Sequence, residues 1–350
     1  MALKFSNLSQ LYAHPFDTII DVRSPAEFAE DHLPGAINLP VLDNEERARV
    51  GTIYVQQSPF LARKLGAALV FRNAATHIET QLSHHEGGWR PLVYCWRGGQ
   101  RSGSFTWMLQ QIGWRAEVIE GGYRSYRRLV KQYLYDDPLP FKLVALDGYT
   151  GTAKTELLAQ LQTRGVQVLD LEALANHRGS LLGEQPGGQP SQKAFESALA
   201  SAMCAHDPAR PVLVEAESSK IGSLILPPAV WQSLCQAPRI LVTADIEART
   251  DYLVAAYDDI LSDAERLQDR LSPLRFHRGH DVVDAWMAQI AEGNKKALTR
   301  ALMEQHYDPA YEKSRRNHRF DVIARVHAVS LTTDGLDQVA SEIEGIVAQL

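Results

Sequence analysis

The chain has 350 residues, roughly twice the length of an ordinary domain, so we expect two domains. Hydrophobic residues make up 45% and charged residues 22%, which excludes a mostly disordered chain. The net charge of −6 excludes a uniformly basic surface, although it is compatible with a local basic patch. Three cysteines are too few for a disulfide framework, and neither a bilayer-spanning apolar run nor a secretory signal pattern is visible. We therefore expect a cytoplasmic protein without a membrane segment.

The first part of the sequence predicts strands that alternate with helices. Residues 18–22 (TIIDV) and 91–94 (PLVY) are short apolar runs typical of buried parallel strands. Residues 105–112 carry apolar side chains at helical spacing, and residues 116–119 predict the next strand. This alternation favours an α/β fold with a parallel sheet that is covered by helices.

A linker is predicted at residues 135–140 (YDDPLP), where prolines and acidic residues interrupt the pattern. We therefore expect one domain over residues 1–137 and a second over residues 138–350. A second α/β pattern begins with the strand predicted at residues 141–146 (FKLVAL). It continues with strands predicted at residues 166–169, 211–214 and 240–243. From residue 246 onward the sequence predicts a polar, helical region, most clearly amphipathic at residues 287–301.

A cysteine opens a glycine-rich loop directly after the strand predicted at residues 91–94. In the loop 95–102 (CWRGGQRS), adjacent glycines allow a tight turn whose amides point inward, and the following helix N-terminus adds positive potential. Such surroundings favour the nucleophilic thiolate of Cys95 and suit a bound oxyanion. A lone cysteine is more often a small buried hydrophobic residue, an interpretation that fits Cys204 and Cys235 better. The predicted oxyanion loop consists of Arg97, Gly98, Gly99, Gln100 and Arg101.

Residues near this loop resemble a rhodanese domain. Residues 21–28 (DVRSPAEF) and 32–38 (HLPGAIN) are similar to the first half of that domain, and the loop 95–102 resembles its active-site loop. The resemblance implies a rhodanese-like fold and a Cys95 that carries sulfur or selenium. Asp21 and Arg23 alone would be a surface ion pair of little energetic value, but beside this loop we expect them to brace it.

A second glycine-rich loop, residues 148–155 (GYTGTAKT), lies between a predicted strand and a predicted helix, as a phosphate-binding P-loop requires. Its backbone amides would surround a diphosphate, its lysine would reach the phosphate oxygens, and its last hydroxyl is a candidate Mg²⁺ ligand. Ala153 stands where glycine usually precedes the lysine. Alanine is harmless there at negative φ and costs about 1 kcal/mol or more at positive φ. The predicted diphosphate-binding residues are Gly148, Gly151, Lys154, Thr155 and, further along the chain, Arg249.

Acidic residues at the ends of later strands are candidates for acid chemistry or for ordering a metal-bound water. Residues 212–215 (VLVE) resemble a Walker-B strand, which points to Glu215 or Glu217, and Asp170 follows an earlier strand. An equally weighted alternative is that these acids only end strands at a solvated edge. Arg249 follows a strand at a position where P-loop kinases often keep a phosphate-facing arginine, but a lone arginine is more often a solvated helix residue. No metal ion is assigned.

The pairing of the two loops in one chain is similar to the bacterial tRNA 2-selenouridine synthase family, and the resemblance covers nearly the full length. Residues 43–54 match an insertion that generic rhodaneses lack. Further matching segments are residues 121–124 (GGYR) with Tyr126 and Arg127, residues 215–222 (EAESSKIG), and residues 307–311 (YDPAY) with Ser314. The expected architecture is therefore a rhodanese-like domain followed by a P-loop NTPase-like α/β domain with a helical C-terminal part.

The resemblance implies a transferase that replaces the sulfur of wobble 2-thiouridine by selenium in tRNA, with tRNAs for Lys, Glu and Gln as expected substrates. Selenophosphate would donate the selenium, and geranyl diphosphate would supply an S-geranyl intermediate. An alkylated sulfur leaves more readily than a thiocarbonyl sulfur, so the intermediate is chemically sensible. The P-loop would then hold geranyl diphosphate and stabilise the departing diphosphate without ATP hydrolysis.

Several points stay open under this interpretation. Cys95 either carries selenium as a perselenide or lies in a loop that only binds the selenophosphate anion. No permanent cofactor is expected beyond these co-substrates, Mg²⁺ is a candidate ion, and a selenophosphate-supplying enzyme is a candidate partner.

Binding of tRNA requires a cationic surface, because contacts to phosphates supply much of the affinity. Two basic clusters are candidates, although charge runs are more often merely solvated. Tyr123 and Tyr126 lie within the first cluster and either stack unpaired bases or pack in the core. The predicted tRNA-binding residues are Arg124, Arg127, Arg128 and Lys131 in the first cluster and Arg315, Arg316 and Arg319 in the second.

Two other interpretations compete. A thiosulfate sulfurtransferase fused to an ATP-using kinase-like domain explains both loops, but it explains neither the additional segments nor the basic cluster near residue 315. Rapid ATP turnover without tRNA would favour it. A non-catalytic regulator that only senses oxyanions is disfavoured, because such a protein needs neither Cys95 nor Lys154.

Overall fold

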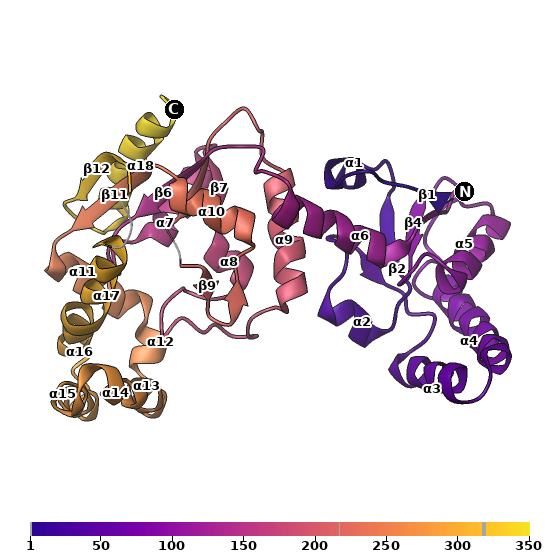
Figure 1. Ribbon diagram of the computed structural model, residues 1–350, viewed down its shortest axis with the longest axis horizontal. Coiled ribbons are helices and arrows are strands. Elements are labelled where there is room, and N and C mark those ends of the chain that lie inside the picture. The colour runs from indigo at the N-terminus through magenta and orange to yellow at the C-terminus, as the bar shows by residue number, and fades with distance from the viewer. Residues whose placement is uncertain (1, 217, 317–319) are drawn as a thin grey trace. The chain divides into compact units, whose positions relative to one another are not determined.

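The computed structural model describes residues 2–216, 218–316 and 320–350, without the side chains of residues 314–316. The chain forms two compact units (Figure 1). The first unit comprises Met1–Pro138 and Pro190–Ala205, and the second comprises Leu139–Gln189 and His206–Leu350.

The first unit contains five parallel strands in the order β1-β5-β4-β2-β3. The strands predicted near residues 18, 91 and 116 are present, whereas the other two are only two residues long, too short for a sequence pattern. The sheet consists of β1 (Ala2–Leu3), β2 (Thr18–Asp21), β3 (Ile37–Asn38), β4 (Pro91–Tyr94) and β5 (Glu117–Ile119).

Helices cover this sheet, as the alternating pattern predicts. The segment that matches the family insertion forms a helix whose Asp43 and Glu46 side chains make a capping box. The predicted helix at residues 105–112 is the later part of a longer one. The helices are α1 (Leu8–Tyr12), α2 (Pro25–Glu30), α3 (Asn44–Gln56), α4 (Pro59–Glu79), α5 (Gln100–Ile112), α6 (Gly122–Lys131) and the π-helical η1 (Gln132–Asp136).

Helix α9 (Gln192–Cys204) follows the first strands of the second unit in sequence but packs on α1, α6 and η1 of the first. Its apolar residues Phe195, Leu199 and Met203 recur at helical spacing and are buried. The sequence-based boundary placed residues 190–205 in the second domain. An amphipathic pattern shows which helix face is buried and does not show against which partner, so the sequence could not assign this helix.

The second unit also contains five parallel strands, in the order β12-β11-β6-β8-β7. Four of them correspond to predicted strands, so the predicted α/β fold with two parallel sheets is confirmed. The strands are β6 (Leu143–Asp147), β7 (Gln167–Leu169), β8 (Val212–Glu215), β11 (Arg239–Ala244) and β12 (Val322–Ala328), and β9 (Lys220–Ile221) with β10 (Leu224–Ile225) forms a separate antiparallel pair.

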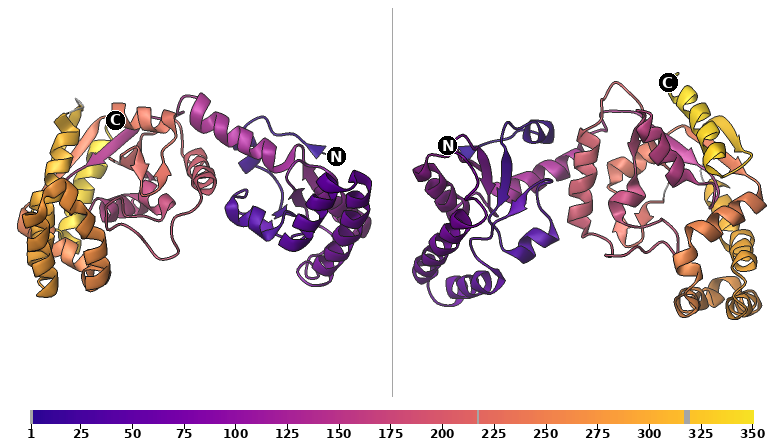
Figure 2. Two further views of the ribbon diagram at one scale, coloured as in Figure 1. Left: turned by 60° about the horizontal axis from the view of Figure 1, so that its bottom comes forward. Right: turned by 180° about the vertical axis from the view of Figure 1, so that it is seen from behind.

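Strand β12 corrects the prediction that the region after residue 246 is helical throughout. It is an edge strand paired only with β11 within its sheet, and four of its seven side chains are exposed. An edge strand lacks the continuous apolar run of a buried parallel strand, which is why the sequence pattern missed it. Helix α18 (Thr333–Val347) follows it and packs on β12 and α7 (Lys154–Thr163), as Figures 1 and 2 show.

Of the remaining helices of the second unit, those between residues 258 and 302 supply most of an apolar cluster that includes the buried Trp286. No helix in the described part of the chain is both long and apolar enough to span a membrane. These helices are α8 (Leu171–Ala175), α10 (Pro228–Gln236), α11 (Ile246–Ala256), α12 (Asp258–Leu261), α13 (Ala264–Leu271), η2 (Ser272–Leu274), α14 (Arg275–Arg278), α15 (His280–Ala291), α16 (Lys295–Leu302), η3 (Met303–Tyr307) and α17 (Asp308–Arg316).

Both glycine-rich loops leave the carboxyl end of an interior strand. The Cys95 loop follows β4, which lies between β5 and β2, and the phosphate loop follows β6, which lies between β11 and β8. In open parallel sheets, ligands bind outside these carboxyl ends. The topology therefore brings residues that end neighbouring strands next to each loop.

One buried ion pair braces the first unit. The Arg23 guanidinium donates to both carboxylate oxygens of Asp21 at 2.6–3.0 Å and to the Asp31 carbonyl at 2.7 Å, and both side chains are essentially inaccessible to solvent. The same guanidinium lies 3.9 Å from the ring centre of Tyr123. Asp21 and Arg23 are thus a buried pair rather than a solvated one.

Replacing Arg23 should destabilise the first unit strongly, because Asp21 would remain as an uncompensated buried charge. We expect Arg23→Met to lower the free energy of unfolding by about 3–5 kcal/mol, measured by denaturant titration with tryptophan fluorescence. Lys193→Met is the matched control, since the Lys193–Glu30 pair is exposed and should contribute at most about 1 kcal/mol. Equal effects of the two variants would contradict this role of the buried pair.

Candidate active-site loops

Cys95 lies at the first position after β4 and is buried. The hydroxyl of Ser102, in the first turn of α5, donates to its sulfur at 3.2 Å. Among the described residues, no side chain caps the N-terminus of α5, so its first amides are available to an anion. The sequence identified the cysteine and its loop but gave Ser102 no role.

Hydrogen-bond donors and the charge of one arginine act on the Cys95 sulfur. Burial alone would raise the pKa of the Cys95 thiol, but the Ser102 hydroxyl, the charge of Arg101 and the amides of Ser102 and Gly99 outweigh it. The pKa of Cys95 is therefore below its ordinary value. Burial raises the pKa of both Cys204 and Cys235 instead. The contrast drawn from the sequence between Cys95 and the other cysteines thus has a physical basis in the structure.

The Cys95 loop rests on the turn that begins α6. Gly98 has φ of +63°, and a β-carbon there would lie 2.5 Å from the Ile119 carbonyl oxygen. A β-carbon at Gly122 would lie 2.2 Å from the Cys95 carbonyl oxygen. The Tyr123 amide donates to that oxygen at 2.8 Å. Residues 121–124, singled out from the sequence as a matching segment, therefore support the reactive loop.

The two arginines of the loop have different surroundings. Arg101 forms an ion pair with Glu27 at 2.9 Å, and Glu27 also takes part in the capping box of α2. Arg97 is exposed, and its guanidinium makes no ion pair among the described residues. Gly99 and Gln100 form the start of α5. Arg97 is thus free to meet an anion, whereas Arg101 acts on the sulfur while it is held by Glu27, a partner that the sequence did not reveal.

In the second unit, Lys154 is buried at the start of α7 beside the end of β8. Its ammonium donates to the Gly148 carbonyl at 3.2 Å and lies 3.4 Å from Glu215 Oε1. Burial raises the pKa of the Glu215 carboxyl, although the charge of Lys154 acts in the opposite direction. Glu215 Oε2 is buried with no hydrogen-bond partner in the described part of the chain. Glu215 therefore contacts the loop lysine from the end of its strand, and its role in acid chemistry or in ordering a metal-bound water stays a prediction.

Ala153 adopts φ of +56° and ψ of +34°, the left-handed conformation that favours glycine. This is the costly one of the two alternatives, at about 1 kcal/mol or more. The residue is also buried in the core cluster of the second unit. The loop therefore keeps the backbone shape that glycine provides in other P-loops, at a cost that the surrounding packing has to offset.

Other predicted acids of the second unit have different surroundings. The Asp170 carboxylate accepts from the Ala173 amide at 2.8 Å and caps α8, which agrees with a structural role. The Thr155 hydroxyl donates to Glu172 at 3.2 Å. Glu172, two residues after Asp170, is thus a second acid, besides Glu215, that contacts the loop, and the sequence did not indicate it. Glu217 lies outside the described residues. No cluster of metal-binding side chains occurs among the described residues.

Arg249 lies beneath the phosphate loop. Its Nε donates to the Thr150 carbonyl at 2.9 Å, and its two terminal nitrogens donate to the Asp308 carboxylate at 3.0 and 2.7 Å. These bonds fix the loop backbone and occupy the guanidinium, which is almost fully buried. Their carboxylate partner, Asp308, lies in the matching segment 307–311. A direct contact of Arg249 with diphosphate stays a prediction.

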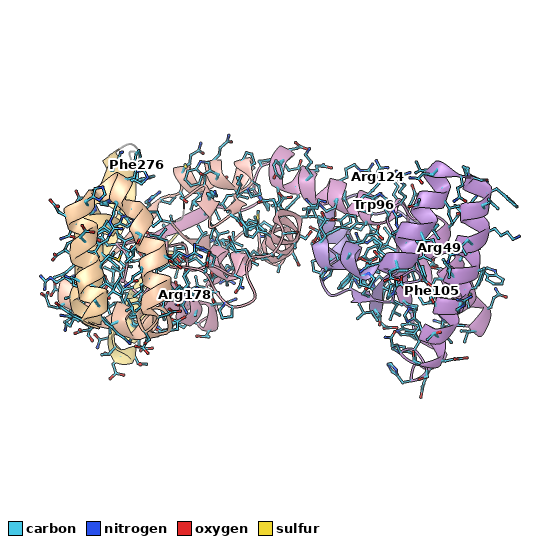
Figure 3. The ribbon with its side chains drawn as sticks, turned by 90° about the horizontal axis from the view of Figure 1, so that it is seen from below. Arg49, Trp96, Phe105, Arg124, Arg178 and Phe276 are labelled. Carbon is cyan, nitrogen blue, oxygen red and sulfur yellow. The ribbon has the colours of Figure 1, made fainter. Side chains whose placement is uncertain are left out.

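The basic cluster on α6 divides into exposed and buried members. Arg124, Arg128 and Lys131 are exposed at helical spacing, and Arg124 is labelled with its neighbour Trp96 in Figure 3. Arg127, by contrast, is held by Glu196, Ser197 and the Lys193 carbonyl. Its assignment to tRNA binding is therefore corrected to a structural role, because helix α9, which the sequence could not place, covers it.

The other tRNA-binding candidates are two buried tyrosines and three arginines whose side chains are not described. Tyr123 and Tyr126 are buried, so they pack in the core and do not offer a stacking surface. Tyr123 donates its hydroxyl to Asp31 at 2.7 Å. The side chains of Arg315 and Arg316 and the whole of Arg319 lie outside the described residues.

Removing the Ser102 hydroxyl should raise the pKa of Cys95, because its hydrogen bond favours the thiolate. We expect the alkylation of Cys95 by iodoacetamide to reach its half-maximal rate at a higher pH in Ser102→Ala than in the unmodified protein. Peptide mass spectrometry would separate this thiol from Cys204 and Cys235. Ser104→Ala, a change on the same helix, is the control, and an unshifted pH profile in Ser102→Ala would refute the assignment.

Two protein-family models match the chain. A rhodanese-like domain matches residues 6–129, which include the Cys95 loop. A domain described as the tRNA 2-selenouridine synthase AAA domain matches residues 141–265, which include the phosphate loop. The predicted order of a rhodanese-like unit and a P-loop unit is confirmed.

Curated proteins described as tRNA 2-selenouridine synthase are similar to this chain over most of its length. The Hahella chejuensis protein is 32% identical over 339 residues, which span 86% of this chain and 86% of that protein. The Alcanivorax borkumensis protein is 33% identical, over 84% and 88% of the two chains. The Shewanella denitrificans protein is 38% identical, over 83% and 77%. This chain therefore belongs to the tRNA 2-selenouridine synthase family.

Proposed function

We propose that this enzyme replaces the sulfur of wobble 2-thiouridine in tRNA by selenium from selenophosphate, by way of an S-geranyl intermediate made from geranyl diphosphate. The observation that carries the proposal is the position of the Cys95 thiol, which accepts a hydrogen bond from Ser102 at 3.2 Å at the start of α5, a helix whose N-terminus has no side-chain cap in the described part of the chain. The same protein also contains a phosphate loop with a buried lysine, Lys154. The first loop offers a thiol, and the phosphate loop offers an ammonium group and helix amides. The proposed reaction has one step for each loop.

The phosphate loop serves the first step. The sulfur of 2-thiouridine attacks C1 of geranyl diphosphate, so that a carbon–sulfur bond forms, the carbon–oxygen bond breaks and diphosphate leaves. The uridine loses its N3 proton to solvent. Lys154 and the amides at the start of α7 stabilise the negative charge of the leaving group. In the described part of the chain no side chain caps α7, which leaves these amides available.

The Cys95 loop serves the second step. The selenium of selenophosphate adds to C2 of the modified base, the carbon–sulfur bond breaks and the sulfur leaves as geranyl thiol. Water then cleaves the phosphorus–selenium bond, so that phosphate leaves and the base, protonated again at N3, is 2-selenouridine. The exposed Arg97 and the amides at the start of α5 suit the selenophosphate anion. Selenophosphate holds selenium at the selenide level, so a perselenide on Cys95 would require a two-electron oxidant. We therefore assign Cys95 to the second step as a group that polarises the bound anion.

Variants of the two loops should separate the two steps. We expect Lys154→Ala to lower geranyl transfer to thiolated tRNA roughly 100-fold or more, as measured by nucleoside mass spectrometry, because the leaving group loses a charged partner. Cys95→Ala should still geranylate tRNA and fail to selenate it. Lys142→Ala and Cys204→Ala are the controls and should retain both steps. Undiminished transfer by Lys154→Ala would exclude the assigned role of the phosphate loop.

We also propose that the exposed face of α6 contacts tRNA phosphates through Arg124, Arg128 and Lys131. Each lost phosphate contact should reduce the slope of log affinity against log salt concentration by about 0.7–0.9, so the triple alanine variant should bind more weakly and with less salt dependence. Fluorescence anisotropy with labelled tRNA measures both quantities. Arg115→Ala removes an exposed arginine just before β5 as a control, and an unchanged slope in the triple variant would contradict the proposed contacts.

A further inference from the structure

An aromatic stack leads from the buried ion pair of the first unit to the residue directly after the reactive cysteine. The Arg23 guanidinium lies 3.9 Å from the ring centre of Tyr123. The ring centres of Tyr123 and Trp96 are 5.3 Å apart, with an interplanar angle of 30°. Arg23 and Tyr123 are buried, whereas Trp96 is partly exposed. The solvent-facing end of the stack is therefore the Trp96 ring, next to Cys95 in the chain.

Two consecutive backbone hydrogen bonds hold Trp96 in place. The Tyr123 amide donates to the Cys95 carbonyl at 2.8 Å, and the Arg124 amide donates to the Trp96 carbonyl at 3.1 Å. Trp96 and Arg124 accordingly lie beside each other in Figure 3. The Trp96 ring is thus attached to a backbone that is fixed on the start of α6.

The indole N–H of Trp96 has no hydrogen-bond partner in the described part of the chain. The indole N–H groups of three buried tryptophans, Trp89, Trp114 and Trp286, each donate to a protein oxygen at 2.9–3.1 Å. Trp96 therefore offers an incoming molecule both an aromatic surface and a hydrogen-bond donor.

Positive charge flanks the exposed ring. Arg97 follows Trp96 in the loop, and Arg124 is bonded to the Trp96 carbonyl through its amide. Both arginine side chains are exposed, and neither forms an ion pair with another described residue. Proteins bind single-stranded nucleic acid with this combination, because the aromatic ring stacks on a base while the cations contact the phosphates.

We propose that Trp96 is the base-binding residue of the second step: the wobble base of tRNA stacks on its ring, which brings the C2 atom of the base to the Cys95 loop. The inference rests on the proposed function and adds the residue that holds the base. The sequence suggested Tyr123 as a stacking surface, but the structure buries that ring against Trp96. Because Trp96 directly follows Cys95, a base on its ring lies beside the loop that binds the selenium anion.

A thermodynamic cycle between Trp96 and the wobble base tests the inference with the full-length protein. The ligands are three anticodon stem–loops whose wobble position carries S-geranyl-2-thiouridine, S-methyl-2-thiouridine or no base. We expect Trp96→Ala to weaken binding of both alkylated RNAs at least about fivefold, because a base–aromatic stack is lost, and to bind the abasic RNA unchanged. Trp96→Phe should retain most of the affinity, since phenylalanine keeps an aromatic face. Trp107→Ala, which removes an exposed tryptophan from α5, is the matched control and should bind all three RNAs unchanged.

The outcomes separate this inference from the proposed function. Unchanged binding of the abasic RNA by Trp96→Ala also shows that the variant is folded. If this variant weakens all three RNAs equally, Trp96 supports the loop and the stacking assignment is wrong. If it weakens only the S-geranyl RNA, the ring contacts the alkyl tail and the assignment to the base is wrong. If the unmodified protein binds none of the stem–loops, the proposed function fails as well.

Discussion

The close approach of two backbone segments fixes the position of Cys95 in the first unit. The Cys95 loop and the turn before α6 lie so near each other that β-carbons at Gly98 and Gly122 would meet backbone atoms at 2.5 Å or less. This contact fixes the Cys95 carbonyl on the Tyr123 amide and places the Tyr123 ring over Arg23. The sulfur is thereby held at the start of α5, where the amides and Ser102 favour its anionic form. The two glycines, the buried Asp21–Arg23 pair and the Cys95 thiol are consequently linked by a continuous set of contacts.

The second unit also has a loop whose backbone conformation favours glycine, but here the position is occupied by alanine. The loop before α7 needs a left-handed residue directly before Lys154, and alanine takes that conformation at an energetic cost. Arg249 and Asp308 hold the loop from below, and Glu215 holds the lysine. Buried charges near the loop are therefore paired with one another, as the cost of burying an isolated charge requires. The two positive side chains of this region, Lys154 and Arg249, are thus each held by an acidic partner.

The sequence predicted the elements with a local signature and missed those that depend on tertiary context. Apolar runs identified β2, β4, β6 and β8, and the glycine-rich loops followed from them. Strand β12 mixes exposed and buried side chains because it is an edge strand, so the sequence pattern predicted a helix there. Arg127 was indistinguishable from its exposed neighbours until α9 was seen to cover it. Glu172, Asp308 and Ser102 had no local signal for their roles, because each acts through a contact that only the fold creates.

The central claim is that one chain geranylates and then selenates the same base. Nucleoside mass spectrometry of thiolated tRNA, incubated with the protein and geranyl diphosphate, tests it when selenophosphate is first withheld and then added. The account predicts that S-geranyl-2-thiouridine accumulates and is afterwards converted to 2-selenouridine. Formation of 2-selenouridine at an undiminished rate without geranyl diphosphate would contradict it.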